Sequence, residues 1–423
     1  MGPSVAVVVL GDFERSPRMK YHCLSLTKSH CNVDIVAYFD TPVSEEIAAN
    51  PLIKIYPLKT NSSFSSCPRI INYFMKTLVQ SFSLLITLFT ITKPDFVLLQ
   101  NPPSVPTIPI VWFYSVIKGV NFVIDWHNYG HTILALSLGP NHLLVKIYRW
   151  CEGFFGSKSY HNFCVSQAMA DDLLKTWNIE ADVFYDRSPD SFKPLESRNK
   201  YNFLRKMAQM FPPFDSGDDS GSKFYEECED GEIIEKKNRP FLLISGTSWT
   251  EDEDFSILLN ALDIYDEKSC ADTSLPDLIC VITGKGPLKT YYQEIISDRC
   301  WTRVSVILPW LTTEDYRRMV SSADVGVSLH TSSSQLDLPM KIIDLFGCCV
   351  PVLAVSFKCL PELVIEDYNG KIFKDSKELA IMLQKLLTQP QTDLKNMRKN
   401  LLSSRKEFSW DIEWNKVVKP IFS

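Results

Sequence analysis

Short apolar runs alternate with longer amphipathic or apolar stretches along most of the chain, and this alternation limits the fold more than any other feature. Runs of strand type lie at 4–10, 33–39, 53–57, 96–100, 120–125 and 163–165. Stretches of helical type, such as 16–29 and 69–91, separate several of these runs. Strands that alternate with helices form parallel sheets covered by helices on both faces. The pattern therefore predicts an α/β fold.

The alternation stops near residue 196 and resumes near residue 240. The segment 196–239 is polar and acidic, with DSGDDSGS at 215–222 and EECEDGE at 226–232. Such a composition cannot bury enough apolar surface to order itself, so it predicts a linker or surface insertion. A second series of strands follows at 241–245, 278–283, 304–308, 325–329 and 350–354, with helices at 255–265, 287–297, 313–322 and 339–346.

A chain of 423 residues is too long for one hydrophobic core, which also favours two domains. We predict an N-terminal domain at 1–195, the acidic insertion at 196–239 and a second domain at 240–395. In the last segment, 396–423, the residues Trp410, Trp414 and Phe422 indicate a helix that packs its aromatic face back on the body. Both domains are expected to be doubly wound and Rossmann-like, facing each other across a cleft.

Charge and cysteine content exclude some functions. The net charge of −6 argues against a general nucleic-acid binder, which needs a basic surface. The twelve cysteines are irregularly spaced and lack the paired CxxC arrangement of a zinc site. No secretion-type segment opens the sequence, so we expect reduced thiols facing the cytosol.

Two apolar stretches raise the question of a membrane. Residues 77–92 are uncharged, and 105–117 are apolar but interrupted by Pro106 and Pro109. Both are shorter than the roughly 20 residues of a spanning helix, so none is predicted. They are either buried core helices or, within 69–117, a surface that dips into the bilayer and receives a lipid substrate.

Open parallel sheets bind ligands beyond the carboxyl ends of their strands. After the first strand, Gly11 and a helix that begins near Ser16 favour an anion site. With Arg15 and Arg18 they could bind the diphosphate of an acceptor. Simple turn and cap chemistry is the alternative for this segment.

The strand that ends at Asp125 is followed by WHNYGH at 126–131, which gathers a carboxylate, two imidazoles and two aromatic rings. Polar functional groups beside aromatic rings are what sugar binding and proton transfer require. His127 and Asp125 are therefore candidates for catalysis.

Donor-binding candidates lie after three strands of the second domain. Small residues follow the first of these strands, a Gly-Lys-Gly turn follows the second, and a serine-rich loop leads into an apolar helix after a third. Lys341 and Asp344 would share one face of that helix, where an acid can accept both hydroxyls of a ribose. The acids at 251–254 most simply cap a helix, with a metal site as the less favoured alternative. The donor-binding candidates are Gly246, Ser248, Lys285, Ser332, Ser333, Ser334, Lys341 and Asp344.

These segments resemble the glycosyltransferase-B (GT-B) superfamily and, more closely, the chitobiosyldiphosphodolichol β-mannosyltransferase family. The matching stretches are VVVLGDFERSPRMKYHCLSL at 7–26, DWHNYGHTIL at 125–134, GTSWTEDEDFSILLNAL at 246–262, VITGKGPLKTYY at 281–292 and LHTSSSQLDLPMKIIDLFGC at 329–348. The resemblance implies transfer of mannose from GDP-mannose to dolichyl diphosphate chitobiose, with a β-1,4 bond formed on the cytosolic face of the endoplasmic reticulum. It also implies a membrane surface, and possible association with other mannosyltransferases of the pathway.

The sequence departs from its relatives in two places. Family members usually carry an N-terminal hydrophobic helix as an anchor, which this chain is expected to lack. Retaining members of the superfamily place a basic pair where this chain has Thr247 and Glu253. Lys285, Lys341 and the serines at 332–334 must then supply the charge and the donors for the diphosphate.

Conversion of an α-mannosyl donor to a β-mannosyl product is inversion, for which one in-line displacement suffices. The base would be His127 or Asp125, with Asp12 and Glu14 as the other candidates, and no metal or other cofactor is required. Two other functions stay open. One is a non-catalytic scaffold subunit of a mannosyltransferase complex, and the other is a glycosyltransferase with a non-lipid acceptor.

Overall fold

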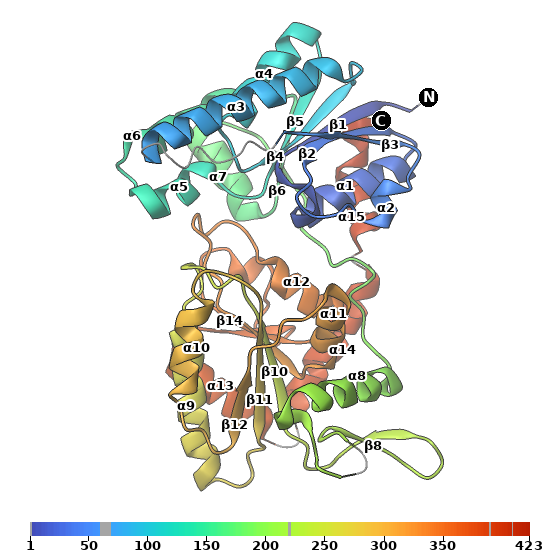
Figure 1. The fold of residues 1–423 in the computed structure, drawn as a ribbon, viewed down its shortest axis with the longest axis vertical. Helices are drawn as coiled ribbons and strands as arrows, with labels where there is room; N and C mark the ends of the chain where they lie inside the picture. Colours follow the sequence, from blue (N-terminus) through green and yellow to red (C-terminus); the bar gives the residue numbers. More distant parts are fainter. Residues whose placement is uncertain (1, 60–68, 219–220, 389–390, 408) are drawn as a thin grey trace. The chain divides into compact units, whose positions relative to one another are not determined.

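The computed structural model describes residues 2–59, 69–218, 221–388, 391–407 and 409–423, without the side chains of 69–74 and 406–407. The chain divides into two compact units. Unit 1 comprises Met1–Asp186 and Asp411–Ser423, and unit 2 comprises Arg187–Trp410. Each unit holds one parallel sheet with helices on both of its faces (Figure 1).

Unit 1 is built on a parallel sheet with the strand order β3-β2-β1-β4-β5-β6-β7. Its strands are β1 (Ser4–Asp12), β2 (Asn32–Tyr38), β3 (Ile53–Pro57), β4 (Phe96–Asn101), β5 (Asn121–Trp126), β6 (His161–Cys164) and β7 (Asp182–Val183). The apolar run Val5–Val9 is fully buried, as expected for a strand covered on both faces. The strand order reverses between β1 and β4, so a ligand site is expected at this switch point.

The last helices of the chain return to unit 1. Trp414 and Phe422 are buried there, and the Phe422 ring lies 5.3 Å from that of Phe96. Trp414 and Phe422 thus pack on unit 1, whereas Trp410 is assigned to unit 2. The helices of unit 1 are η1 (Phe13–Arg15), α1 (Pro17–Lys28), α2 (Glu45–Ala48), α3 (Arg69–Thr90), α4 (Thr107–Lys118), α5 (Gly130–Leu138), α6 (Leu143–Gly156), α7 (Gln167–Trp177), α15 (Trp410–Val417) and η4 (Lys419–Phe422).

Unit 2 contains a second parallel sheet, with the order β12-β11-β10-β13-β14-β15 and its reversal between β10 and β13. Its strands are β10 (Phe241–Gly246), β11 (Leu278–Thr283), β12 (Val304–Ile307), β13 (Val325–Ser328), β14 (Val352–Val355) and β15 (Gly370–Phe373). The two doubly wound sheets confirm the predicted fold class. The helices of unit 2 are α8 (Ser197–Met210), η2 (Pro212–Phe214), α9 (Phe255–Ala271), α10 (Lys289–Ser297), α11 (Thr313–Ser322), α12 (Met340–Gly347), η3 (Leu360–Glu362), α13 (Ser376–Leu387) and α14 (Thr392–Glu407).

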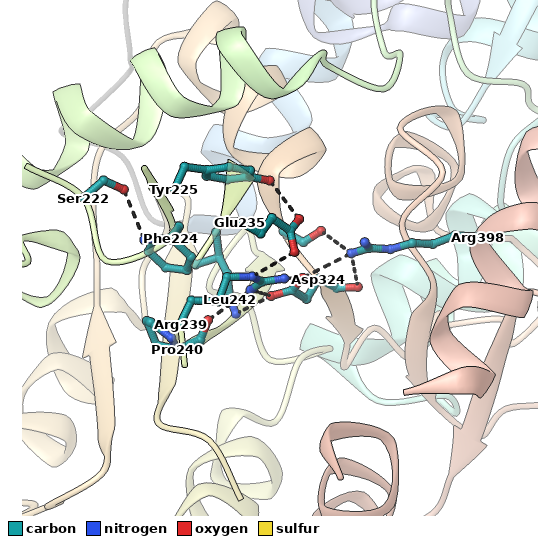
Figure 2. Close-up of polar contacts among 10 residues, drawn as sticks. Ser222, Phe224, Tyr225, Glu235, Arg239, Pro240, Leu242, Asp324 and Arg398 are labelled. Carbon is teal, nitrogen blue, oxygen red and sulfur yellow. Dashed lines mark hydrogen bonds and ion pairs between the residues drawn. The ribbon is translucent and has the colours of Figure 1, made fainter. Parts of the chain in front are cut away.

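The acidic segment 196–239 differs from the predicted linker, because much of it is folded onto unit 2. Helix α8 buries Tyr201, Phe203, Leu204 and Met207, and a hairpin of β8 (Tyr225–Glu227) and β9 (Ile233–Glu235) follows. The segment is anchored by Arg239, whose guanidinium donates to Asp324 Oδ2 at 2.6 Å and to Oδ1 at 2.7 Å (Figure 2). Arg398, from α14, donates to the same aspartate. A composition-based prediction missed this, because the apolar residues of α8 are spaced by a helical period among charged ones.

Although burial alone would raise it, the charges of Arg239 and Arg398 hold the pKa of Asp324 below its usual value. In the described part of the chain, no helix is long and apolar enough to span a bilayer.

Candidate functional site

The centre of unit 1 is a buried ion pair between α1 and the end of β5. Arg18 donates to both oxygens of Asp125, from Nε to Oδ2 at 2.7 Å and from NH2 to Oδ1 at 2.9 Å. Its NH1 group donates to the carbonyl of Phe184 and to Asp186 Oδ1, both at 2.9 Å. Arg18 is buried, and four hydrogen bonds use all but one of the five N–H groups of its guanidinium. The predicted binding of the acceptor diphosphate by Arg18 stays a prediction, and the structure shows its side chain holding Asp125 and Asp186.

Two imidazoles complete the surroundings of the Asp125 carboxylate. His22 Nε2 lies 3.2 Å and His127 Nε2 lies 2.9 Å from Asp125 Oδ2. Although burial alone would raise it, the charge of Arg18 and the hydrogen bonds from both histidines hold the pKa of Asp125 well below its usual value. A buried carboxylate so stabilised as an anion is a poor proton acceptor. Asp125 is therefore less suited than His127 to accept a proton, and its contacts suit it to orient its neighbours.

His127 keeps one ring nitrogen available. Because the Asp125 anion can only accept, His127 Nε2 carries the hydrogen and Nδ1 holds a lone pair. Among the residues that the structure describes, no hydrogen-bond partner of this Nδ1 is found, and the side chain is 22% exposed. A carboxylate that fixes the tautomer of a histidine general base has this arrangement. His127 is the base candidate that the geometry favours.

The other two base candidates join neighbouring loops. Asp12 accepts hydrogen bonds from the hydroxyl of Thr41 at 2.5 Å and from its backbone at 3.4 Å. Glu14 accepts from the backbone N–H of Ser44 at 2.8 Å. Both carboxylates therefore hold the loop after β1 against the segment after β2, and neither Asp12 nor Ser16 caps a helix through its side chain.

Of the three residues predicted to bind the acceptor diphosphate, one presents its side chain to solvent. The Arg15 side chain is 80% exposed, and its Nε lies 3.3 Å from Asp12 Oδ2. A Cβ at Gly11 would meet a single side-chain atom, 3.9 Å away, so no close backbone approach requires this glycine. The structure thus gives less support for an acceptor-diphosphate site after β1 than the sequence did.

A second histidine–carboxylate pair, which the sequence did not reveal in full, adjoins the first. Glu152, buried on α6, accepts from Gly130 N at 2.7 Å and contacts His131 Nδ1 at 2.5 Å. The hydroxyl of Ser104 also donates to Glu152. Glu152 is the one acidic residue in the sequence of α6, and this could have indicated a buried polar contact, because a buried carboxylate needs hydrogen-bond partners.

In unit 2, Glu253 gathers the residues around the end of β10. It is buried and accepts from Thr247 Oγ1 at 2.5 Å, Ser248 N at 2.9 Å and Lys341 Nζ at 2.5 Å. Lys341, which was predicted to share one helix face with Asp344, lies three residues from it on α12 and pairs with Glu253 on a different loop. Glu253 thus holds Lys341 in place.

The glycines of the Gly-Lys-Gly turn allow two loops to touch. A Cβ at Gly284, where φ is 150°, would lie 1.7 Å from the carbonyl oxygen of Thr247. A Cβ at Gly286 would lie 1.7 Å from that of Ser248. Between them, Lys285 places Nζ 3.8 Å from the centre of the Trp310 ring, which belongs to a residue that is 61% exposed. This cation–π contact occupies the ammonium predicted to bind the diphosphate.

The serine-rich loop after β13 is organised by its own hydroxyls. Ser332 contacts Asp337 Oδ1 and accepts from the backbone N–H groups of Ser334 and Gln335, both at 3.2 Å. Ser334 Oγ accepts from Leu336 N at 3.2 Å. The hydroxyls of Ser332 and Ser334 therefore shape the loop. Ser333, which is partly exposed, remains a candidate for binding the sugar donor.

His330, which begins this loop, lies between two aspartates. Its Nδ1 is 2.9 Å from Asp252 Oδ2, and its Nε2 is 3.7 Å from Asp337 Oδ2. Although burial alone would lower it, the hydrogen bonds to both carboxylates raise the pKa of His330 to about 9. His330 is thus a cation at neutral pH and adds positive charge that the sequence did not assign.

Asp344 has the opposite environment to Asp125. It is partly buried on α12, and the hydroxyl of Tyr316 donates to its Oδ2 at 3.4 Å. Burial raises the pKa of Asp344 to about 7, against the smaller opposing effects of Tyr316 and Arg317. A Cβ at Gly246 would lie 3.2 Å from that tyrosine hydroxyl and 3.9 Å from Lys341 Cδ. Gly246, Tyr316, Lys341 and Asp344 therefore converge at the end of β10.

No group of three or more histidine, cysteine, aspartate or glutamate side chains is placed to hold a metal ion within the described ranges. Asp254 caps α9 by accepting from Ser256 N at 2.9 Å, which is the simpler role predicted for the acids at 251–254.

Comparison with known proteins identifies the family. Residues 229–403 match the family model for glycosyl transferases group 1. Proteins from Mus musculus and Homo sapiens, both named chitobiosyldiphosphodolichol beta-mannosyltransferase, are 42% and 43% identical to the chain. The alignments cover 99% of this chain and 89% and 92% of those proteins. An Arabidopsis thaliana protein named UDP-glycosyltransferase TURAN is 38% identical, over 99% of this chain and 96% of its own.

Solved structures support the fold. Anabaena HepE in complex with UDP and glucose has a TM-score of 0.67 at 12% identity, with 99% of each chain covered. WaaG, described as a glycosyltransferase involved in lipopolysaccharide biosynthesis, has a TM-score of 0.59. Both sheets, both switch points and the near full-length relatives agree, so the chain belongs to the chitobiosyldiphosphodolichol β-mannosyltransferase family and has the GT-B glycosyltransferase fold.

Proposed function

We propose that the chain transfers mannose from GDP-mannose to dolichyl diphosphate chitobiose in a single inverting step, with His127 as the general base. The observation that carries the proposal is the His127 imidazole, whose Nε2 hydrogen is directed to Asp125 and whose Nδ1 lone pair is available. His127 Nδ1 accepts the proton of the acceptor hydroxyl as its oxygen attacks the anomeric carbon. The bond to the GDP oxygen breaks on the opposite face of the sugar, and GDP leaves.

Unit 2 supplies the donor site in this proposal. Asp344 accepts hydrogen bonds from the ribose hydroxyls. The protein itself gives this carboxylate one long hydrogen bond, from Tyr316, so the ribose supplies the hydrogen-bond donors that it lacks. Lys341 lies beside Gly246 at the end of β10, where it can neutralise the leaving diphosphate. His330 belongs to the loop that leads into α12, where Asp252 and Asp337 flank it and offset its positive charge. The proposal requires the two sites to meet across one cleft, which stays a prediction.

A membrane surface, on the cytosolic face of the endoplasmic reticulum, is the proposed location of the reaction. Helices α3, α4, α5 and α6 of unit 1 adjoin one another, as the Phe89–Tyr114 and Trp112–Phe155 ring contacts illustrate. Large apolar side chains are exposed on them: Phe82, Ile86, Phe113, Val116, Ile117, Leu136, Leu143, Ile147, Trp150 and Phe154. We call this set the apolar face.

Cations accompany the apolar face. Lys118, Lys146, Arg149 and Lys158 lie on or next to the same helices, whereas the acids Asp125 and Glu152 of this region are buried. Apolar side chains bordered by cations suit the boundary of a bilayer with anionic lipids. The surface predicted at 69–117 therefore extends to α5 and α6. Co-sedimentation with anionic vesicles should weaken when Leu143 and Trp150 are replaced by glutamine, and an unchanged bound fraction would refute this part.

The reaction is tested with radiolabelled GDP-mannose and phytanyl diphosphate chitobiose as the acceptor. The expected product is a trisaccharide lipid whose new mannose is released by a β-mannosidase and resists an α-mannosidase. GDP-glucose and UDP-glucose serve as competing donors. An α-linked product, or transfer from another nucleotide sugar alone, would contradict the proposal.

A further inference from the structure

The C-terminal helix α15 reaches the catalytic network through Trp414. The indole Nε1 of Trp414 lies 3.1 Å from His22 Nδ1, and both side chains are buried. The two residues are 392 positions apart in the sequence. His22 in turn lies 3.2 Å from Asp125 Oδ2, the oxygen that also binds His127. A continuous series of contacts thus leads from Trp414 to the proposed base.

The donors and acceptors of this series fix the tautomer of His22. An indole N–H can only donate, so His22 Nδ1 must be the acceptor in the contact with Trp414. The hydrogen of the neutral ring is therefore on Nε2, where it is donated to the Asp125 carboxylate. Burial lowers the pKa of His22, against the attraction of Asp125, which agrees with a neutral ring.

We propose that Trp414 is a positioning residue that keeps His22 neutral and thereby preserves the negative charge with which Asp125 supports the His127 base. A proton could bind His22 Nδ1 only by displacing the indole N–H from it. The inference rests on the proposed role of His127 and adds the C-terminal helix to the requirements of catalysis.

The charges around His22 explain why its neutrality matters. Asp125 faces it from β5, Arg18 from one turn earlier on α1, and His127 from the loop after β5, while Asp186 binds the far side of Arg18. A proton on His22 would place a second full positive charge against Asp125. The carboxylate would then attract a proton on His127 less strongly, and His127 would become a weaker base.

The variant Trp414→Phe tests the inference, because phenylalanine fills most of the same space without the N–H group. We expect its His22 to titrate, so that the acid limb of the kcat profile depends on two protons instead of one. At about pH 6 the loss in kcat should be roughly tenfold, and it should be smaller at about pH 8. The KM for the donor should not change.

A matched control removes the same type of bond elsewhere. In unit 2, Trp301 donates from Nε1 to Asp263 Oδ1 at 2.8 Å. Trp301→Phe should leave the shape of the pH profile unaltered, even if it reduces stability. A second variant, Trp414→Phe combined with His22→Gln, cannot protonate at position 22, so it should return the acid limb to a single proton.

Nitrogen-15 NMR of histidine side chains gives a readout that needs no activity. In the unaltered protein, the His22 signals, identified by their loss in His22→Gln, should report the neutral Nε2–H form from about pH 5.5 to about pH 8.5. In Trp414→Phe they should titrate. A His22 that titrates in the unaltered protein, or one that stays neutral in Trp414→Phe, overturns the inference. Because the spectra can also be recorded in His127→Ala, a failure of the proposed function is distinguished from a failure of this inference.

Discussion

Asp125 in unit 1 and Asp344 in unit 2 are both enclosed aspartates near the carboxyl ends of parallel strands, yet their pKa values shift in opposite directions. Asp125 faces the two-pronged guanidinium of Arg18 and two histidines, and its pKa is held well below the usual range. Asp344 receives one long hydrogen bond from Tyr316, and burial raises its pKa to about 7. The difference lies in the partners that the fold supplies, because burial by itself raises both values.

The comparison separates two uses of a carboxylate. At Asp125 the protein provides the donors, so the anion is permanent and can orient the neighbouring imidazole. At Asp344 the protein leaves most of the acceptor capacity open, so the group gains its full stabilisation when a ligand brings hydroxyl donors. In the proposed reaction, the satisfied carboxylate of Asp125 supports catalysis, and the less satisfied one of Asp344 binds the donor.

The largest effect is expected when the group that Asp125 orients is removed. His127→Ala should lower kcat by about 10²- to 10⁴-fold, because the acceptor hydroxyl loses its base. The affinity for GDP, measured by calorimetry, should stay within a factor of about two if the donor is held by unit 2 alone. His142→Ala is the control, since His142 is exposed and caps α6. Equal activity of the two variants would remove His127 from the mechanism.

Replacing the satisfied carboxylate should cost the most stability. Asp125→Asn removes one of the two carboxylates that pair with the buried Arg18 and leaves only Asp186, so the free energy of unfolding should fall by about 3 kcal/mol, the lower end of the range for a broken buried pair. Thermal and urea unfolding at pH 8 measure this change. A loss below about 1 kcal/mol, the value of an exposed pair, would show that Arg18 finds another partner.

Asp344→Asn, the same substitution at the open carboxylate, should mainly weaken donor binding. The amide cannot accept two ribose hydroxyls as a carboxylate does, and hydrogen bonds to charged groups contribute about 1.5–3 kcal/mol. The affinity for GDP should therefore fall roughly 10- to 100-fold. Inorganic pyrophosphate, which lacks the ribose, is the matched ligand, and its affinity should not change. An equal loss for both ligands would place Asp344 near the diphosphate instead.

The smallest effects, measured per pH unit, concern the pH dependence of stability, which should have opposite signs for the two aspartates. The pKa of Asp344 in the folded protein, about 7, exceeds the unfolded value of 3.8, so its stabilisation is present below about pH 4 and is lost as the pH rises through 7. The pKa of Asp125 is lowered, so its stabilisation is present above the unfolded value and is lost in acid. Each pH unit between two such values changes stability by about 1.4 kcal/mol.

Unfolding measured at pH 5 and pH 8 tests this pair of signs. The difference in stability between Asp344→Asn and the unaltered protein should favour the variant more at pH 8 than at pH 5. The reason is that the aspartate ionises in this range and asparagine cannot. Affinity for GDP in the unaltered protein should also rise with pH up to about 7 and then level off. A flat dependence of both quantities would mean that Asp344 is already ionised at pH 5.

Local patterns predicted the elements well. Every predicted strand exists with ends within two residues of the expected ones, as 53–57 and 278–283 illustrate with identical bounds. Burial on both faces gives such strands continuous apolar runs that local reading detects. The acidic segment was misread because its apolar residues are few, although helical spacing collects those of α8 on one face.

The site was harder to predict, because the partners of its charges are far away in the sequence. Arg18 was assigned to the acceptor from its place at a helix N-terminus, yet its partner is Asp125, 107 positions away. Lys341 was assigned to the face of Asp344, and its ion-pair partner Glu253, 88 positions earlier, was not predicted. His127 was rightly placed beside Asp125, because the two are separated by a single residue on the end of one strand.

The sequence by itself therefore determined two doubly wound parallel sheets, the strand ends at which polar side chains gather and the family of the chain, because these depend on local spacing and on motifs that can be read in order. Only the tertiary structure decided which charge faces which. That choice made Asp125 a permanent anion, left Asp344 able to titrate near neutral pH and brought Trp414 of the last helix against His22. The physical reason is that a pKa depends on burial and on neighbours a few ångströms away, and folding selects those neighbours from distant parts of the chain.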